Sequence, residues 1–330
     1  TRCQSVTGVQ TCALPIWHEP EPVVDLHPRD MARLGWVNGD LIQLDSRRGG
    51  LILPIRSCEQ VAPMQCFIAM HWGDEHVWGT ARDGRRAAGV NALTSSAYCP
   101  DSKQPELKHA AVKLAKVDLP WRLLALAWLP ADEVLIVRQR LADLVEGLGS
   151  ALPFALCVPF GRERTGLLLR AAAPGPLPRA WLEELEAVLG LGRTGVLHYA
   201  DDKRGQRRSM RLAAHADGGQ RLDALLLGGD ISAEAWVKTV LQEDLPAQAY
   251  GRLLLSPGAQ PPVSVAARGR QVCSCFDVSE PRIVDALRAC VGSGEARLLQ
   301  LQQGLKCGTQ CGSCVPELKR LERATTPQPA

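Results

Sequence analysis

The chain has 330 residues, of which 46% are hydrophobic and 22% charged, with a formal net charge of +3. This composition is typical of a globular protein of two or three domains, and the near balance of charge excludes a general nucleic-acid binder. One of the longest uncharged runs, residues 147–161, contains two prolines and, like the others, is shorter than the roughly 20 apolar residues of a membrane span. We therefore expect a cytoplasmic protein with neither a membrane nor a nucleic-acid partner.

Residues 17–118 are rich in strand signals. Short β-favouring runs such as DLIQLDS and LILPIR are separated by the turn sequences NGD and RRGG. Between the first two runs, HPRDMARLG predicts a short helix with Pro28 in its first turn and Gly35 at its end. Several short strands with one or two short helices predict a closed β-barrel.

Residues 121–255 mix strand-like runs such as TGLLLRA with helix-like runs, which predicts an α+β domain. In RAWLEELEAVLG, residues 180–189 carry apolar side chains on one helical face, which predicts a core-facing helix. The basic stretch KRGQRRSMR, residues 203–211, is expected to be a solvated loop or strand face. The region offers no pairing of a nucleophile with a base, so we expect a docking or spacing role and no catalytic residue.

The chain then changes character. Residues 256–270, SPGAQPPVSVAARGR, read as a linker, and a small helical unit over residues 271–324 is followed by a tail, residues 325–330. Of the 12 cysteines, half are scattered singly, where buried and inert thiols are expected, and half lie within residues 273–314. Such clustering in a chain without an export signal favours a metal site over disulfides.

The clustered cysteines form two pairs, C-S-C at 273–275 and C-G-S-C at 311–314, with 35 residues between them. SEPRIVDALRACVGSG predicts a helix with Ser279 as its N-cap and Gly292 as its stop, and ARLLQLQQGL and CVPELKRLER predict two more. A helical hairpin would bring the pairs together and place the second pair at a helix N-terminus, which favours thiolates. Four thiols fit a 2Fe-2S cluster, a tetrahedral zinc or disulfides, and the single residue between the first two is unusual for zinc.

This spacing resembles the bacterioferritin-associated-ferredoxin type of 2Fe-2S domain over residues 271–324. The resemblance implies a 2Fe-2S cluster with the ligands Cys273, Cys275, Cys311 and Cys314. Cys307 is an extra thiol outside this pattern, and Cys290 is expected to pack in the helix core.

MHWG at 70–73 and GVNALTSSAYCPDSKQPELKHAAVKL at 89–114 resemble the C-terminal molybdopterin-dinucleotide-binding domain of bacterial assimilatory nitrate reductases. In that family the domain is a double-psi β-barrel, which is the expectation for residues 17–118. Residues 1–16, TRCQSVTGVQTCALPI, do not follow the family pattern and read as a non-native or artefactual segment. Residues 196–241 resemble the small α+β domain that precedes the same 2Fe-2S module in assimilatory nitrite reductases.

The resemblance implies a molybdopterin guanine dinucleotide cofactor with molybdenum. The pyrophosphate and the ring edges of such a cofactor need cationic donors, amide side chains and backbone N–H groups. Residues that offer these groups, or that end the apolar strand before them, are His71, Trp72, Gly73, Asn91, Thr94, Ser102, Lys103 and Gln104.

The resemblance therefore implies the C-terminal fragment of a nitrate reductase, with nitrate as substrate and electrons from a ferredoxin, a flavodoxin or an NADH-linked reductase. The 4Fe-4S cluster and the molybdenum pocket of that family have no counterpart in this sequence, so we expect the chain alone to be inactive. Two alternatives stay open: a non-catalytic electron-transfer or cofactor-binding module, and part of another molybdopterin oxidoreductase such as a formate dehydrogenase relative.

Overall fold

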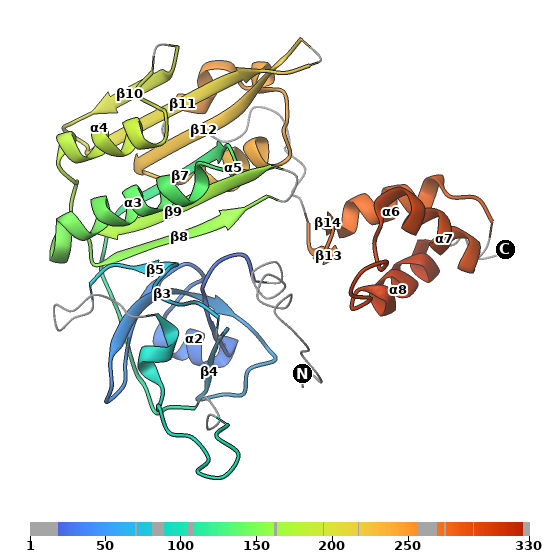
Figure 1. Ribbon diagram of the computed structural model, residues 1–330, viewed down its shortest axis with the longest axis horizontal. Coiled ribbons are helices and arrows are strands. Elements are labelled where there is room, and N and C mark those ends of the chain that lie inside the picture. Colours follow the sequence, from blue (N-terminus) through green and yellow to red (C-terminus); the bar gives the residue numbers. More distant parts are fainter. Residues whose placement is uncertain are drawn as a thin grey trace. The chain divides into compact units, whose positions relative to one another are not determined.

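The computed structural model describes residues 19–69, 71–80, 89–104, 109–161, 164–193, 195–216, 218–256, 269–273, 275–292 and 294–325. They fall into two compact units, the larger spanning Glu21–Val263 and the smaller containing Ser264–Ala330. The fold is multidomain and mixed α/β, with several separate sheets (Figure 1). Among the described helices, none has the length and apolar character that a membrane crossing demands.

The larger unit begins with a five-stranded sheet in the order β4-β1-β3-β2-β6. Its strands are β1 (Val24–Leu26), β2 (Leu41–Asp45), β3 (Gly50–Ser57), β4 (Cys66–Ile68) and β6 (Lys113–Lys116). The pairing of β1 with β3 is parallel, and the other pairings are antiparallel. Helix α2 (Pro28–Leu34) ends at Gly35, whose φ of +67° suits a residue without Cβ, so the predicted helix is confirmed.

The sheet is not closed among the described residues, so the predicted barrel is not confirmed. One physical reason is the course of β5 (Val77–Trp78), which pairs with β8 (Phe154–Phe160) in a second sheet. That sheet has seven strands in the order β10-β11-β12-β7-β9-β8-β5, and all its pairings are antiparallel. Its remaining strands are β7 (Trp121–Leu129), β9 (Thr165–Ala173), β10 (Leu197–Asp201), β11 (Gln206–Ala214) and β12 (Gln220–Gly229).

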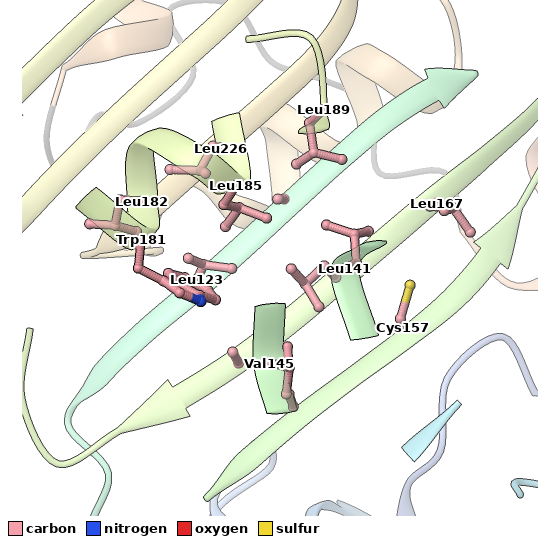
Figure 2. Packing of buried hydrophobic residues seen from close by; sticks show 14 of the residues in the cluster. Leu123, Leu141, Val145, Cys157, Leu167, Trp181, Leu182, Leu185, Leu189 and Leu226 are labelled. Atoms are coloured by element: carbon pink, nitrogen blue, oxygen red, sulfur yellow. The ribbon is translucent and has the colours of Figure 1, made fainter. Parts of the chain in front are cut away.

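Helices α3 (Val134–Leu148) and α4 (Arg179–Val188) pack on one face of the seven-stranded sheet, and α5 (Glu234–Gln242) contacts β12. Figure 2 shows Leu141 of α3, Leu185 of α4 and Leu123 of β7 among the buried side chains of the resulting core. The predicted core face of α4 is confirmed. Short 3-10 helices complete the unit: η2 (Val90–Leu93), η3 (Gly149–Ala151), η4 (Ala247–Ala249) and η5 (Gly251–Leu255).

The basic stretch is solvated only in part: Lys203 and Arg204 are exposed, whereas residues 207–210 of β11 are buried, so the prediction of a solvated face was wrong for the strand. Arg207 is 6% exposed and Arg208 is 0% exposed. Arg207 donates two hydrogen bonds to the Glu186 carboxylate, at 2.8 and 2.6 Å, while Arg208 donates to Asp230 Oδ2 at 3.2 Å and to a backbone carbonyl at 2.9 Å. Buried guanidinium groups are tolerated because these partners replace the lost hydration.

The smaller unit consists of a short hairpin and three helices. Strands β13 (Gln271–Cys273) and β14 (Val278–Ser279) pair antiparallel, and α6 (Glu280–Ala289), α7 (Gly294–Leu305) and α8 (Val315–Thr325) follow. The three predicted helices are confirmed, although α6 ends before Gly292, with Cys290 as its C-cap. A buried ion pair ties the helices together, because Arg297 of α7 donates to Glu322 of α8 at 3.1 Å and to Leu287 O of α6 at 2.8 Å.

A second buried ionic network lies in the larger unit. The Glu21 carboxylate, just before β1, accepts hydrogen bonds from Arg170 of β9 and from Lys238 of α5, the latter at 2.6 Å. Arg170 also donates to Glu234 at the start of α5. Burial alone would raise the pKa of Glu21, but Arg170 and Lys238 lower it from 4.5 to about 2. The network therefore fastens the segment before β1 to the second sheet.

We expect Glu21→Gln to lower the free energy of unfolding at pH 7 by about 3 kcal/mol, since each unit of pKa shift is worth about 1.4 kcal/mol. Because the folded-state pKa is depressed, the wild-type contribution is present above about pH 4.5 and is lost as the pH falls toward 2. The two proteins should therefore converge in stability in acid. Urea unfolding at several pH values measures this, with the exposed Glu184→Gln as a control. A constant difference at all pH values would contradict the assignment.

Candidate cofactor sites

Five cysteine side chains of the smaller unit meet in one place, which we call the thiol cluster. Two come from the start of the unit and three from the loop between α7 and α8: Cys273, Cys275, Cys307, Cys311 and Cys314. Four of them are at most 7% exposed, whereas Cys311 is exposed. The cysteines of the described residues are all free, so no disulfide competes for these thiols.

The loop between α7 and α8 is shaped by left-handed backbone. Lys306, Gly308 and Gly312 have φ values of +57°, +78° and +71°. A Cβ on Gly308 would lie 2.9 Å from a methyl group of Val315, so only glycine fits there without displacement. The Lys306 carbonyl accepts a hydrogen bond from Thr309 Oγ1 at 2.7 Å, which fixes the turn. This turn points Cys307 into the core, where it is 0% exposed.

The thiols make contacts between the two motifs. Cys275 Sγ donates to Cys311 Sγ at 3.1 Å, and Cys311 Sγ lies 3.0 Å from Ser313 Oγ. Cys273 lies in the same buried cluster as Cys307 and Cys314, and both of their side chains lower its pKa. The predicted approach of the two cysteine pairs is therefore present in the structure, while Ser274 between the first two lies outside the described residues.

These contacts shift the pKa values of the thiols in different directions. Hydrogen bonds from the Cys307 thiol, and then from the backbone N–H groups of Gly308 and Phe276, outweigh burial and lower the pKa of Cys273 to about 5. Burial, followed by the negative charge of Cys273, raises the pKa of Cys314 to about 12. Burial also raises the pKa of Cys275, whereas hydrogen bonds from Ser313 and Cys275 lower that of Cys311 against the effect of its burial. The site thus favours negative charge on the sulfurs of Cys273 and Cys311 and disfavours it on those of Cys275 and Cys314.

Cys314 lies directly before α8, where its carbonyl accepts the Leu318 N–H at 2.9 Å. The positive end of the helix dipole lies beside this thiol, but burial and the negative charge of Cys273 still keep the pKa of Cys314 high. Several thiols, an apolar surround and backbone N–H donors to sulfur make a donor set that fits an iron-sulfur cofactor. No three His, Cys, Asp or Glu side chains in the described ranges form a ready site for a single metal ion.

The residues expected at a pterin site lie in two separate places. The first joins His71–Gly73 to the η2 helix, because Val90 N–H donates to Trp72 O at 2.9 Å. Gly89 makes this approach possible: its φ is +73°, and a Cβ there would lie 2.7 Å from Gly73 Cα. Asn91, in η2, is exposed, and Thr94, which caps its end, is half-buried.

Trp72 is 1% exposed and serves the core instead of presenting a ring face to solvent. Its ring packs against His71 at 5.0 Å and edge-on against His76 at 5.4 Å between centroids. His76 is also buried, and its Nδ1 lies 3.1 Å from Cys157 O of β8. Burial lowers the pKa of His76, which favours the neutral ring. The segment before β5 is therefore anchored to the second sheet.

Ser102, Lys103 and Gln104 lie exposed in the second place, a closed loop of their own. Lys103 N–H donates to Cys99 O at 2.9 Å, and Cys99 N–H donates to Gln104 O at 2.8 Å. Lys103 has a φ of +56°, and its ammonium lies 5.5 Å from the centre of the Tyr98 ring. Sequence reasoning missed Gly89 and Tyr98, although the glycine directly before VNAL was a signal for the close approach.

Comparisons with known families fit this arrangement. Residues 1–111 match the family described as Molydopterin dinucleotide binding domain, and residues 271–321 match the BFD-like 2Fe-2S binding domain. The chain carries both domains. Together they indicate a molybdopterin dinucleotide and a 2Fe-2S cluster as cofactors. The first match includes residues 1–16, so the interpretation of this segment as non-native remains a prediction.

Several relatives are named nitrate reductase. The protein from Klebsiella oxytoca is 30% identical over 99% of this chain, which spans 33% of that relative. The Synechocystis protein is 42% identical over 22% of this chain, which corresponds to 9% of that relative. The Symbiobacterium thermophilum protein is 36% identical over 28% of this chain, which corresponds to 11% of that relative. A solved structure, acetylene hydratase from Pelobacter acetylenicus, aligns with 35% of this chain and 16% of its own, at 21% identity and a TM-score of 0.24.

We expect Gly89→Ala to destabilise the molybdopterin-binding part by at least about 1–2 kcal/mol, the cost of a left-handed residue with a side chain, plus the clash with Gly73. Gly147→Ala is the matched control, because Gly147 lies inside α3 with nothing within 4 Å of the position that a methyl group would occupy, and alanine there should stabilise by up to about 1 kcal/mol. Thermal unfolding of both variants measures the difference. Equal stability of the two would contradict the close approach.

Proposed function

We propose that the chain is the C-terminal cofactor-binding and electron-relay part of a molybdenum-dependent assimilatory nitrate reductase, which reduces nitrate to nitrite in the cytoplasm. The observation that carries the proposal is the thiol cluster in the same chain as a molybdopterin dinucleotide-binding domain. Identity of 30% to a protein named nitrate reductase along 99% of the chain supports the oxidoreductase class.

In the complete enzyme, residues 17–118 contribute the double-psi β-barrel, residues 121–255 a docking domain and residues 256–270 the linker to the 2Fe-2S domain. The docking domain supports the molybdopterin-binding segment through the pairing of β5 with β8 and through the Glu21 network. The Glu21 network holds the start of the molybdopterin-binding segment against the second sheet, and the β5 pairing holds its middle there. A rigid support for cofactor-contacting loops is the expected requirement of such a site.

We assign Cys273, Cys275, Cys311 and Cys314 as the four thiolate ligands. When bound, the 2Fe-2S cluster supplies a one-electron carrier between an external donor and the molybdenum centre. The backbone N–H groups of Phe276 and Gly308 donate to the Cys273 sulfur, and the apolar core excludes water from three of the ligands. Exposed Cys311 lies on the accessible side of the site, where a ferredoxin, a flavodoxin or an NADH-linked reductase would approach.

The residues assigned to the pterin dinucleotide are His71, Trp72, Gly73, Asn91, Thr94, Ser102, Lys103 and Gln104. Trp72 acts through packing, because it is buried and holds His71 in place. Lys103 and the amide side chains of Asn91 and Gln104 are exposed and supply the cation and hydrogen bonds that phosphate and ring edges require. The molybdenum pocket and a 4Fe-4S cluster belong to the rest of the enzyme, so this chain alone should not reduce nitrate.

The chain, produced under anaerobic reducing conditions, should contain two irons and two acid-labile sulfides. Cys314→Ser should lose both, because it removes a ligand thiolate that lies before α8. Cys290→Ser should keep both, since Cys290 Sγ donates to Ala286 O at 3.2 Å and lies at the end of α6, outside the thiol cluster. Chemical iron and sulfide analysis measures this outcome. One zinc per chain without sulfide would refute the cluster.

In the longer enzyme that contains this chain, reduced viologen should drive nitrite formation from nitrate, and Lys103→Ala should lower both the activity and the molybdopterin content. Loss of a charge-assisted hydrogen bond costs about 1.5–3 kcal/mol, which is about tenfold or more in affinity. Lys113→Ala is the control, since Lys113 is an exposed residue of β6. Equal cofactor content in the two variants would remove Lys103 from the site, and absence of nitrite formation by the unaltered enzyme would overturn the proposed reaction.

A further inference from the structure

The turn between β2 and β3 carries two arginines on its surface. It spans residues 46–49, and the Ser46 hydroxyl accepts hydrogen bonds from the N–H groups of Arg48 at 3.0 Å and of Gly49 at 3.3 Å. The Ser46 N–H donates to Gly49 O at 2.9 Å and closes the turn. The turn is thus held by its own groups, while the side chains of Arg47 and Arg48 are exposed.

This turn lies against η2, in the first of the two places assigned to the pterin. A Cβ on Gly49 would lie 3.1 Å from Ala92 O and 3.4 Å from Ala92 Cβ, so the backbone of the turn passes close to the helix. Ala92 follows Asn91, whose exposed side chain is assigned to the cofactor. At its start, η2 is hydrogen-bonded to the segment 71–73 through the Val90 N–H. The turn therefore borders the same helix as that segment.

The residues assigned to this first place include no lysine or arginine: they are His71–Gly73, Asn91 and Thr94. The assigned cation, Lys103, lies in the separate loop closed by Cys99. The pyrophosphate of a dinucleotide carries at least two negative charges, and such charges are costly to bury unless cations pair with them. A guanidinium group binds phosphate through two parallel N–H···O hydrogen bonds. The turn supplies the cations that the first place lacks.

The two guanidinium groups are not committed elsewhere in the part of the chain that the structure describes. There, neither Arg47 nor Arg48 forms an ion pair or a side-chain hydrogen bond. Asp45 provides the nearest carboxylate along the chain, and its Oδ1 accepts a hydrogen bond from Gln43 Nε2 at 2.8 Å. Two adjacent cations without a carboxylate partner fit an anion that carries two charges.

We propose that Arg47 and Arg48 bind the pyrophosphate of the molybdopterin dinucleotide through their guanidinium groups. The inference rests on the proposed function, and it adds two residues to the cofactor site that the sequence did not indicate. It also places the pyrophosphate at the turn beside η2.

The test uses the longer enzyme that contains this chain, with Arg47→Ala, Arg48→Ala and Arg48→Lys. Arg29→Ala is the matched control, because Arg29 is an exposed arginine in the first turn of α2. Fluorescence of the oxidised pterin measures the cofactor content and the half-life of cofactor release after dilution. Thermal unfolding of the cofactor-free form is measured for each variant.

Each alanine variant should release the cofactor about tenfold faster or more, as expected for the loss of a charge-assisted hydrogen bond. Arg48→Lys keeps the charge without the planar fork, so its half-life should lie between those of the alanine variant and the wild type. Arg29→Ala should match the wild type in half-life. The unfolding midpoint of the cofactor-free form should be the same in all variants, because surface charges contribute little to stability.

Release half-lives in Arg47→Ala and Arg48→Ala equal to that of Arg29→Ala overturn the inference and leave the proposed function intact. A lowered midpoint of the cofactor-free form assigns the arginines to a structural contact and also overturns it. If the alanine variants do not fold, Arg48→Lys decides, since a wild-type half-life in that variant contradicts a guanidinium contact. Absence of molybdopterin dinucleotide from the unaltered enzyme overturns the proposed function itself.

Discussion

The arrangement of the smaller unit depends on one constraint: sulfur atoms 36 positions apart must reach contact distance. Cys275 and Cys311 meet this constraint at 3.1 Å. Three helices between and after them bring the loop back, and the buried Arg297–Glu322 pair fixes α7 against α8. An ion pair buried to this degree contributes little net stability but tolerates few alternative alignments of its helices. A site made of several thiols requires such specific packing, because small displacements of the helices would move its sulfur atoms apart.

The two cofactor sites are built on different principles. Every assigned thiol belongs to one small unit with its own core. The residues assigned to the pterin lie instead in two segments, a local loop closed by Cys99 and a segment whose position depends on a distant strand. The His71–Gly73 segment precedes β5, which the second sheet holds through the Val77–Leu156 pairing. The α+β part therefore supports the molybdopterin-binding part structurally, and the two act as one unit even though their sequences suggest separate domains.

The sequence predicted those features that are local. Helix α2 was readable from Pro28 and Gly35, and the helices of the smaller unit were readable from their caps and periodicity. The approach of the cysteine pairs followed from their spacing, because one hairpin suffices to join them. The candidate residues within 89–104 could be predicted from their side-chain chemistry. The sequence did not predict that they lie in two separate places.

Features that depend on distant partners were not predictable. Strand β5 has two residues and no local signal, and its partner lies in β8. The burial of Arg207 and Arg208 depends on Glu186 and Asp230, which lie in other elements. A basic stretch reads as solvated unless its carboxylates are known in advance, because the cost of burying a charge is offset only by specific partners. Composition does not predict this burial either, because paired charges leave the net charge near zero.

Within the proposed ligand set the four thiols are not equivalent. Cys273 is buried, whereas Cys311, which contacts Cys275, lies at the surface. Donors to sulfur stabilise negative charge where they act, and solvent exposure favours contact with a partner. Cys273 would therefore hold the buried side of a bound cluster, and Cys311 would hold its exposed side, which a partner can approach. This difference between the two sides follows from where the turn before α8 places each thiol.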